Sequence, residues 1–150
     1  MDKAFNFAYE KYQWEPIELT TPDGYVLTSF IISKAYNEEM PNPPVIIQHG
    51  NGQDGAMWLQ ALKADGLPFF FNIVNNGFPV WLMNSRGTDY SRKHVSFELT
   101  SPEFWNFDLF DMWQDIEGNI KTIKAYTGYD TFWYIGYSSA TSQMLYAMQE

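Results

Sequence analysis

Short apolar runs alternate with polar, turn-forming segments along this chain. Residues Glu15–Thr21 and Tyr25–Ile32 are rich in β-forming side chains, and the turn signal Pro22-Asp23-Gly24 separates them. This pattern predicts a β-hairpin. Three later runs are short and apolar enough to predict buried strands, and these are Val45–Gln48, Pro79–Met83 and Phe132–Ile135.

Two segments have the signals of helices. Phe69–Asn76 is followed by Gly77, and glycine is common just past the end of a helix. A longer helix is predicted from Ser101 to Gly128, because serine is a favoured N-cap and Pro102 would occupy the first helical position. Its apolar stripe recurs at steps of three and four residues through Trp105, Leu109, Met112, Ile116, Ile120 and Ile123.

Strands and helices therefore alternate after the hairpin, and the strands are apolar on both faces. That arrangement is typical of a parallel sheet covered by helices on both sides. No internal repeat, low-complexity tract or interdomain linker interrupts the sequence, so we expect residues 1–150 to form a single α/β domain.

The composition excludes several classes of function. The net charge of −9 argues against nucleic-acid binding, which needs clustered Lys and Arg side chains to neutralise phosphates. Because the chain has no cysteine, it can form neither a disulfide nor a thiolate metal site. We expect no cofactor and no metal.

The sequence contains no sign of membrane insertion or export. The start of the chain, Met1–Asn6, lacks the apolar segment of a signal peptide. The longest apolar stretch, Leu67–Phe71, is interrupted by Pro68 and is too short to span a bilayer. The compartment stays open on this evidence.

The segment Gly136-Tyr137-Ser138-Ser139-Ala140 directly follows the last predicted strand. A strand that ends at a small-x-Ser-x-small turn and continues into a helix is typical of a nucleophile elbow. In such an elbow, the serine hydroxyl stands at the tip of a sharp bend, where a base can deprotonate it. Taken alone, the same five residues are also compatible with an ordinary turn.

Three motifs each follow a predicted strand, namely His49-Gly50, Asn84-Ser85-Arg86-Gly87 and Gly136-x-Ser138. With these motifs the chain resembles the acid lipases of the α/β-hydrolase fold, the family of the gastric and lysosomal lipases, from about Tyr12 onward. The residues that carry the resemblance are Thr21–Leu27, Gln48-His49-Gly50, Trp58, Phe78–Leu82, Asn84–Gly87, Ser91–His94, Ser101-Pro102, Glu103-Phe104-Trp105 and Phe107.

The resemblance implies serine-dependent hydrolysis of lipid esters through an acyl-enzyme. It makes Ser138 the nucleophile and assigns the oxyanion hole to the backbone N–H groups of Asn51 and Ser139. Two preorganised amide donors suit this chemistry, because the attacked ester carbonyl becomes an oxyanion. Transient contact with a lipid surface is implied for the full-length form.

Two departures from the family pattern stand out. Ala140 occupies a position where the elbow usually has a second glycine. In this fold an acid and then a histidine follow the serine, and both are expected beyond residue 150. Neither His49, which the family uses structurally, nor His94 is a credible base, and a serine without a base is a weak nucleophile.

We therefore interpret the chain as the N-terminal half of an α/β-hydrolase sheet, without the cap domain and the C-terminal strands. With nothing to pair on its far side, Phe132–Ile135 is expected to form an exposed apolar edge. The alternative is a truncated, non-catalytic hydrolase-like module that binds lipid or a partner.

Other features have structural explanations that we prefer over functional ones. We expect Asp108, Asp111, Asp115 and Glu117 to form a solvated face of the long helix, rather than paired catalytic carboxylates. Arg86 is expected to bond to loop carbonyls, and His94 to lie in a solvated loop. The aromatic run Phe69–Phe71 is assigned to the core rather than to lipid contact.

Overall fold

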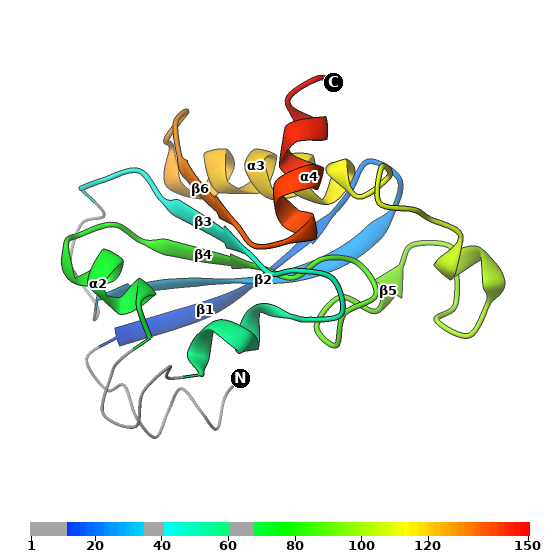
Figure 1. The fold of residues 1–150 in the computed structure, drawn as a ribbon, viewed down its shortest axis with the longest axis horizontal. Helices are drawn as coiled ribbons and strands as arrows, with labels where there is room; N and C mark the ends of the chain where they lie inside the picture. Colours follow the sequence, from blue (N-terminus) through cyan, green and yellow to red (C-terminus); the bar gives the residue numbers. More distant parts are fainter. Residues whose placement is uncertain (1–11, 35–40, 61–67) are drawn as a thin grey trace.

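The computed structural model describes residues 12–34, 41–60 and 68–150 (Figure 1). Met1–Asn6 and Leu67, which entered the predictions on export and membrane insertion, lie outside these ranges. In the described part, a twisted mixed sheet has helices on both faces. This agrees with the predicted α/β class and with the N-terminal half of a hydrolase sheet.

The chain begins with the predicted hairpin. Strands β1 (Tyr12–Thr20) and β2 (Tyr25–Lys34) pair antiparallel, with Thr20 opposite Val26 beside the turn. In the turn the Thr21 hydroxyl donates to the Asp23 carboxylate at 2.6 Å, and Gly24 has a φ of 99°, which favours glycine. The two strands extend beyond the predicted limits because their pairing continues to Tyr12 and Lys34.

Three short parallel strands form the other half of the sheet. The strand order is β1-β2-β4-β3-β6 among the described residues, and a two-residue strand, β5, pairs with β2. All three apolar runs of the sequence form strands as predicted. Their bounds are β3 (Val45–Gln48), β4 (Val80–Met83) and β6 (Trp133–Gly136), with β5 at Lys93–His94.

The strands divide their side chains between two hydrophobic clusters, one on each face of the sheet. In β3, Val45 and Ile47 belong to one cluster and Ile46 belongs to the other. In β4 the side chains of Trp81 and Met83 lie on the same face as Ile46. This alternation is the period of two that a strand imposes on its side chains, and it explains why both faces are apolar.

Helices cover the two clusters. The buried aromatic side chains of Phe70 and Phe71 lie on α2 and pack into the first cluster, as predicted for that run, whereas Phe69 is partly exposed. Ile116 and Ile123 of α3 pack into the second cluster. The bounds are η1 (Gly55–Leu59), α2 (Phe70–Asn75), η2 (Pro102–Trp105), α3 (Trp113–Thr127) and α4 (Ser139–Ala147).

The long helix predicted from Ser101 is wrong at its start. Ser101 does cap a helix, and its side chain accepts a hydrogen bond from Phe104 N–H, but that helix is the short 3₁₀ turn η2. The chain then leaves the helical path at Asn106, which has φ −81° and ψ 64°. A new turn begins after Asp108, whose carboxylate accepts from the N–H groups of Phe110 and Asp111 as an N-cap does.

The second half of that prediction is confirmed. Helix α3 ends at Gly128, which has a φ of 74°, and Ile116 and Ile123 are buried as the stripe requires. By contrast, Trp105 is 47% exposed, because it precedes α3 and does not share its face. Among the described helices, even the longest, with 15 residues, falls short of what a membrane crossing requires in length and apolar character.

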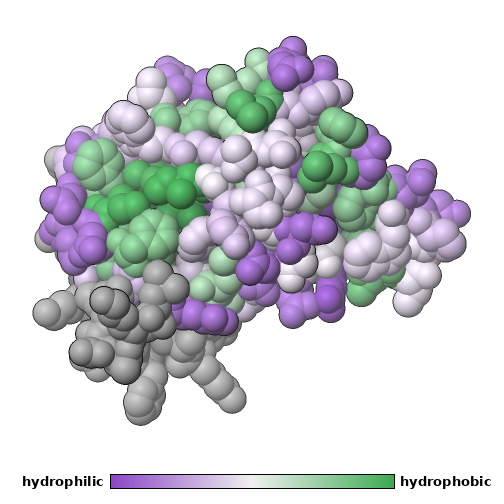
Figure 2. Space-filling view, viewed as in Figure 1, coloured by the Kyte–Doolittle hydropathy of each residue, from purple (hydrophilic) through white to green (hydrophobic). Residues whose placement is uncertain are grey.

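Strand β6 lies at the edge of the described sheet. Its alternate side chains face outward, with Trp133 63% exposed and Ile135 36% exposed. Other exposed apolar side chains, including Leu145 of α4, are scattered, and Figure 2 shows several separate hydrophobic areas on the face drawn. The expected exposed apolar edge is confirmed for the described residues, and such an edge favours association between copies.

We predict that Trp133→Lys reduces self-association of the chain with little change in its free energy of unfolding. A lysine on an edge strand opposes edge-to-edge pairing, and the tryptophan loses little buried surface because it is mostly exposed. Light scattering over a concentration series measures the effect. Leu145→Lys, at a similarly exposed position on α4, is the matched control, and an equal reduction by both variants would show that the edge has no special role.

Candidate functional site

Three loops meet at one edge of the sheet because three parallel strands end there together. In the register of the sheet, Gln48 at the end of β3 is paired with Met83 of β4 and with Gly136 of β6. The loops that follow carry the three motifs singled out from the sequence. In open α/β sheets, ligands bind outside these carboxyl ends, so this edge is the candidate site.

The loop after β6 has the backbone of a nucleophile elbow. Ser138 has φ 56° and ψ −122°, and among the described residues no other non-glycine residue has a positive φ. A side chain at Gly136 would meet the Tyr134 ring at 2.8 Å and the backbone of Ala140 at 3.2 Å. The methyl group of Ala140 is fully buried without displacing α4, which begins at Ser139.

The loop after β3 lies directly against this elbow. A Cβ added to Gly50 would come within 3.0 Å of the Ser138 Cβ and 3.1 Å of the Tyr137 ring. Asn51 follows Gly50, and Ser139 is the first residue of α4, where a backbone N–H has no acceptor within the helix. The structure thus brings together the three residues predicted for the site, Ser138, Asn51 and Ser139.

His49 holds the loop after β3 against the loop after β4. Its Nε2 accepts a hydrogen bond from Ser85 N–H at 3.1 Å, so the proton is on Nδ1, which donates to the Gly50 carbonyl at 2.8 Å. Burial lowers the pKa of His49 below its ordinary value of 6.5, although the bond to Gly50 acts in the opposite direction. The imidazole is therefore neutral, fully bonded and structural, as expected.

His94, the other histidine, also makes hydrogen bonds through both ring nitrogens. It lies in the short strand β5, where Nδ1 accepts from the N–H groups of Ser96 and Phe97. Its Nε2 then donates to the Asp23 carbonyl at 3.0 Å. The prediction of a histidine in a solvated loop is thus corrected, because His94 is half-buried in β5 and backbone groups bind both ring nitrogens. Neither histidine of this chain has a ring nitrogen available to activate Ser138.

Asn84 connects the loop after β4 to its neighbours. This fully buried side chain accepts from Gly55 N–H at 2.7 Å and donates to the Thr28 carbonyl at 2.6 Å. Its own carbonyl accepts from the Ser91 hydroxyl at 3.0 Å. Since Gly55 ends the segment that begins at His49, Asn84 helps to determine where that segment lies.

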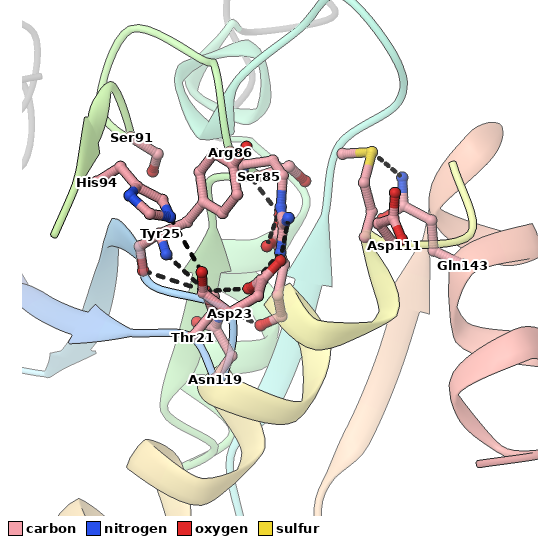
Figure 3. A network of polar contacts seen from close by, with 12 residues as sticks. Thr21, Asp23, Tyr25, Ser85, Arg86, Ser91, His94, Asp111, Asn119 and Gln143 are labelled. Atoms are coloured by element: carbon pink, nitrogen blue, oxygen red, sulfur yellow. Dashed lines mark hydrogen bonds and ion pairs between the residues drawn. The ribbon is translucent and has the colours of Figure 1, made fainter. Parts of the chain in front are cut away.

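The buried side chain of Arg86 is the centre of an ion-pair cluster (Figure 3). Its Nη1 and Nη2 donate to both oxygens of Asp23 at 2.6 and 3.0 Å, and its Nε donates to Asp115 at 2.8 Å. The guanidinium carbon also lies 3.9 Å from the centre of the Tyr25 ring. Arg86 is structural, as predicted, but it binds carboxylates and not loop carbonyls.

The expectation that Asp115 lies on a solvated face is wrong. Its side chain is fully buried, and it accepts from both the backbone N–H and the side chain of Arg86. Burial raises the pKa of Asp115 to about 6, and Arg86 offsets part of that effect. For Asp23, burial also raises the pKa, but the hydrogen bonds from Arg86 and Thr21 outweigh it and lower the pKa overall.

A cavity of about 820 Å³ opens beside the elbow and the loop after β3. One part of its wall is polar, and another part is formed by sulfur-containing and aromatic side chains. Its lining includes His49, Asn51, Ser85, Ser139 and Gln143, together with Met57, Trp105, Phe107 and Met112. Such a cavity has room for a small ligand with an apolar group, and it lies beside the loop that carries Ser138 and Ser139.

Three polar side chains below the elbow were given no role of their own from the sequence. Gln48 bonds to Gln143, to Tyr134 and to Ser85. The available signal was a glutamine at the end of an apolar strand and another one turn into a short helix. Neither glutamine indicated its partner, because 95 residues separate them along the chain.

Two known families match this chain, and together their matches cover the candidate site. Residues 43–150 match the family described as the alpha/beta hydrolase fold. Residues 6–62 match the family described as the partial alpha/beta-hydrolase lipase region. The two matches overlap at the loop after β3, which is the part of the site that carries His49 and Asn51.

Among known proteins, the chain is similar to human lysosomal acid lipase/cholesteryl ester hydrolase, with 33% identity over 139 residues, and to human lipase member K, with 34% identity over 139 residues. Each alignment covers 90% of this chain and 34% of the relative. The chain therefore spans about a third of the length of these relatives.

Solved structures support the same fold. An esterase of Pyrococcus furiosus superposes with a TM-score of 0.65 and 16% identity, covering 93% of this chain and 47% of that chain. An acetyl xylan esterase of Paenibacillus sp. R4 gives a TM-score of 0.63 at 12% identity, covering 95% of this chain and 46% of the esterase. At this level of identity the likeness concerns the fold alone.

We predict that Arg86→Met destabilises the chain by about 3 kcal/mol or more, because it leaves the buried carboxylate of Asp115 without its counter-ion. Urea unfolding measures the difference. Arg92→Met is the matched control, since Arg92 pairs with Asp89 on the surface and its loss is expected to change stability by about 0.5 kcal/mol or less. Equal effects of the two substitutions would contradict the structural role of Arg86.

A second prediction concerns pH. In the unfolded chain His49 takes up a proton near its ordinary pKa of 6.5, whereas in the folded chain its pKa is lower. As the pH falls through 6.5, the unfolded state therefore binds more protons, and the contribution of His49 to the free energy of unfolding decreases. Asp115, with its raised pKa, acts in the opposite direction over the same range. The contribution of His49 must therefore be obtained as a difference between two proteins.

His49→Gln keeps an acceptor for Ser85 N–H and removes the titration. We expect its free energy of unfolding to fall less than that of the wild type between about pH 7.5 and about pH 5.5. Urea unfolding at the two pH values measures this, with His94→Gln as the matched control. The same loss of stability in the wild type and in His49→Gln would show that His49 is not buried in the neutral form.

Proposed function

Because this chain belongs to the alpha/beta-hydrolase fold family, we propose that it carries the nucleophile and the oxyanion hole of a serine hydrolase that acts on lipid esters. Its resemblance to the acid lipases is confirmed by the matching lipase region and by the lipase relatives. We propose Ser138 as the nucleophile, the backbone N–H groups of Asn51 and Ser139 as the two amide donors, and a lipid ester as the substrate.

In this mechanism Ser138 Oγ attacks the carbonyl carbon of the ester, and its proton passes to a base. The carbonyl oxygen becomes an oxyanion between the backbone N–H groups of Asn51 and Ser139, where each donor contributes about 3 kcal/mol to lowering the barrier. The carbon–oxygen bond to the alcohol breaks, the alcohol leaves with the proton, and an acyl-enzyme remains. Water then releases the acid by the same steps.

The observation that carries the proposal is the backbone of Ser138. A non-glycine residue in this conformation is strained by about 1–3 kcal/mol, and such strain is typical of functional sites. The Ser138 side chain is exposed, so packing does not explain why a serine occupies the position. A hydroxyl held at the tip of the bend, beside two loop amides, suits a nucleophile.

Lipid esters are proposed as substrates because the relatives are named lipases and cholesteryl ester hydrolases. The cavity supports this choice, since Met57, Trp105, Phe107 and Met112 line its apolar part. Trp105 is also partly exposed, so it lies both in the cavity and at the surface. Transient contact of this rim with a lipid surface is part of the proposal.

The base and the acid of the triad must come from outside these 150 residues. Both ring nitrogens of His49 and of His94 are bound to backbone groups, so the chain holds no free histidine. The family order places the acid and the histidine after the serine. We propose that this chain is the N-terminal portion of the hydrolase and reacts slowly alone.

Because both histidines are already hydrogen-bonded through their ring nitrogens, a second candidate is also favoured. This candidate is a non-catalytic hydrolase-like module that binds lipid or a partner. The two candidates differ in whether Ser138 has any special reactivity. An elbow serine beside a formed oxyanion hole reacts faster than a helix serine, even without its base, because the hole stabilises the attacked centre.

We therefore predict that a fluorophosphonate probe labels Ser138 of the wild-type chain slowly and selectively. Mass spectrometry after proteolysis identifies the labelled serine and gives the rate. Ser138→Ala is expected to abolish labelling, whereas Ser142→Ala, at an exposed serine of α4, leaves it unchanged. Labelling of Ser138 and Ser142 at equal rates, or no labelling, would favour the non-catalytic module.

A further inference from the structure

Below the two loops of the proposed site lies the buried side-chain amide of Gln48. This residue is the last of β3 and directly precedes His49, Gly50 and Asn51, so its position determines where the loop begins. The side chain is 0% exposed. A buried amide without partners is unfavourable, so the identity of its partners matters.

Every polar group of this amide is satisfied, and each partner lies on a different segment. Its Nε2 donates one hydrogen to Gln143 Oε1 at 2.6 Å and the other to Ser85 Oγ at 3.2 Å. Its Oε1 accepts from the Tyr134 hydroxyl. The amide thereby joins β3 to β6, to the loop after β4 and to helix α4.

Gln143 is the partner from the elbow helix. It lies five residues after Ser138, and its side chain is almost completely buried. Its own Nε2 points to Met112 Sδ at 3.6 Å, so its carbonyl oxygen remains for Gln48 (Figure 3). A backbone bond from Tyr137 N–H to the Gln48 carbonyl, at 3.1 Å, joins the same two segments.

We infer that Gln143 is a positioning residue for the proposed reaction. It acts through Gln48 and fixes the distance between the elbow, which carries Ser138, and the loop that carries Asn51. The inference rests on the proposed function for its catalytic meaning. The Gln143–Gln48 bond, which couples the elbow to the loop after β3, is a property of the fold itself.

The coupling matters because an oxyanion hole requires its donors within a few tenths of an ångström of their proper places. One donor belongs to α4, at Ser139, and the other belongs to the loop after β3, at Asn51. Along the chain these two residues lie 88 positions apart. Their relative position therefore depends on contacts such as the Gln143–Gln48 bond.

The test compares Gln143→Met with Gln143→Glu. Methionine fills a similar volume without an acceptor and leaves an N–H of Gln48 unsatisfied, whereas glutamate keeps an acceptor oxygen in place. Gln149→Met, at an exposed glutamine after α4, is the matched control. The measured quantity is amide hydrogen exchange, resolved by residue with NMR.

Two amides report on the coupling because their acceptors belong to residues 48 and 49. These are Tyr137 N–H, bound to the Gln48 carbonyl, and Ser85 N–H, bound to His49 Nε2. In Gln143→Met we expect exchange at both to rise about tenfold or more, with little change at Ile31 in the middle of the sheet. Gln143→Glu and Gln149→Met are expected to keep wild-type rates at both reporters.

The inference is wrong if the reporters exchange at wild-type rates in Gln143→Met, or if exchange rises equally at Ile31, which would indicate a general loss of stability. It is also wrong if Gln143→Glu behaves like Gln143→Met, because the acceptor would then be irrelevant. Labelling of Ser138 by the fluorophosphonate is measured separately. A wild-type chain that does not label counts against the proposed function, whereas the exchange rates decide on Gln143.

Discussion

The buried guanidinium of Arg86 holds together three parts of the chain that are distant in sequence. It binds Asp23 in the hairpin turn and Asp115 in helix α3, and it belongs to the loop that follows β4. Breaking such a pair leaves a buried charge without a partner, so the three segments are stable only as a unit. The turn, the helix and the loop therefore keep one arrangement, and the site is built on that arrangement.

The two residues that precede Arg86 connect its loop to the elbow region. Ser85 N–H binds His49, and Asn84 binds Gly55, so both ends of the loop after β3 are tied to the loop after β4. Gln48 then connects that loop to α4 and β6. These bonds are buried and directional, and they keep the loops after β3 and β4 and the elbow in one arrangement.

The sequence predicted most of the strands because each is apolar along its length and is bounded by turn residues. The elbow was also predicted, since a small-x-Ser-x-small segment after a strand has a local geometric cause. The start of α3 was missed because the chain leaves the helical path at Asn106 and turns again only after Asp108, whose carboxylate caps the new turn. Helical spacing alone does not show such a break.

The buried polar partners were missed for a different reason. Asp115 lies among acidic residues that suggest a solvated helix face, and only its contact with Arg86, 29 residues away, explains its burial. Gln48 and Gln143 likewise acquire meaning only as a pair. Long-range polar pairing leaves no periodic signal, in contrast to the hydrophobic spacing from which helices and strands are predicted.

The strain at Ser138 supports the proposed serine hydrolase over the non-catalytic module. Glycine adopts a positive φ without penalty, so an elbow with no chemical role would be more stable with glycine at this position. The serine contributes little buried surface in return, because Ser138 is exposed. A hydroxyl held at such a strained position therefore supports the proposed reactive centre, since a module that only binds would have no need of it.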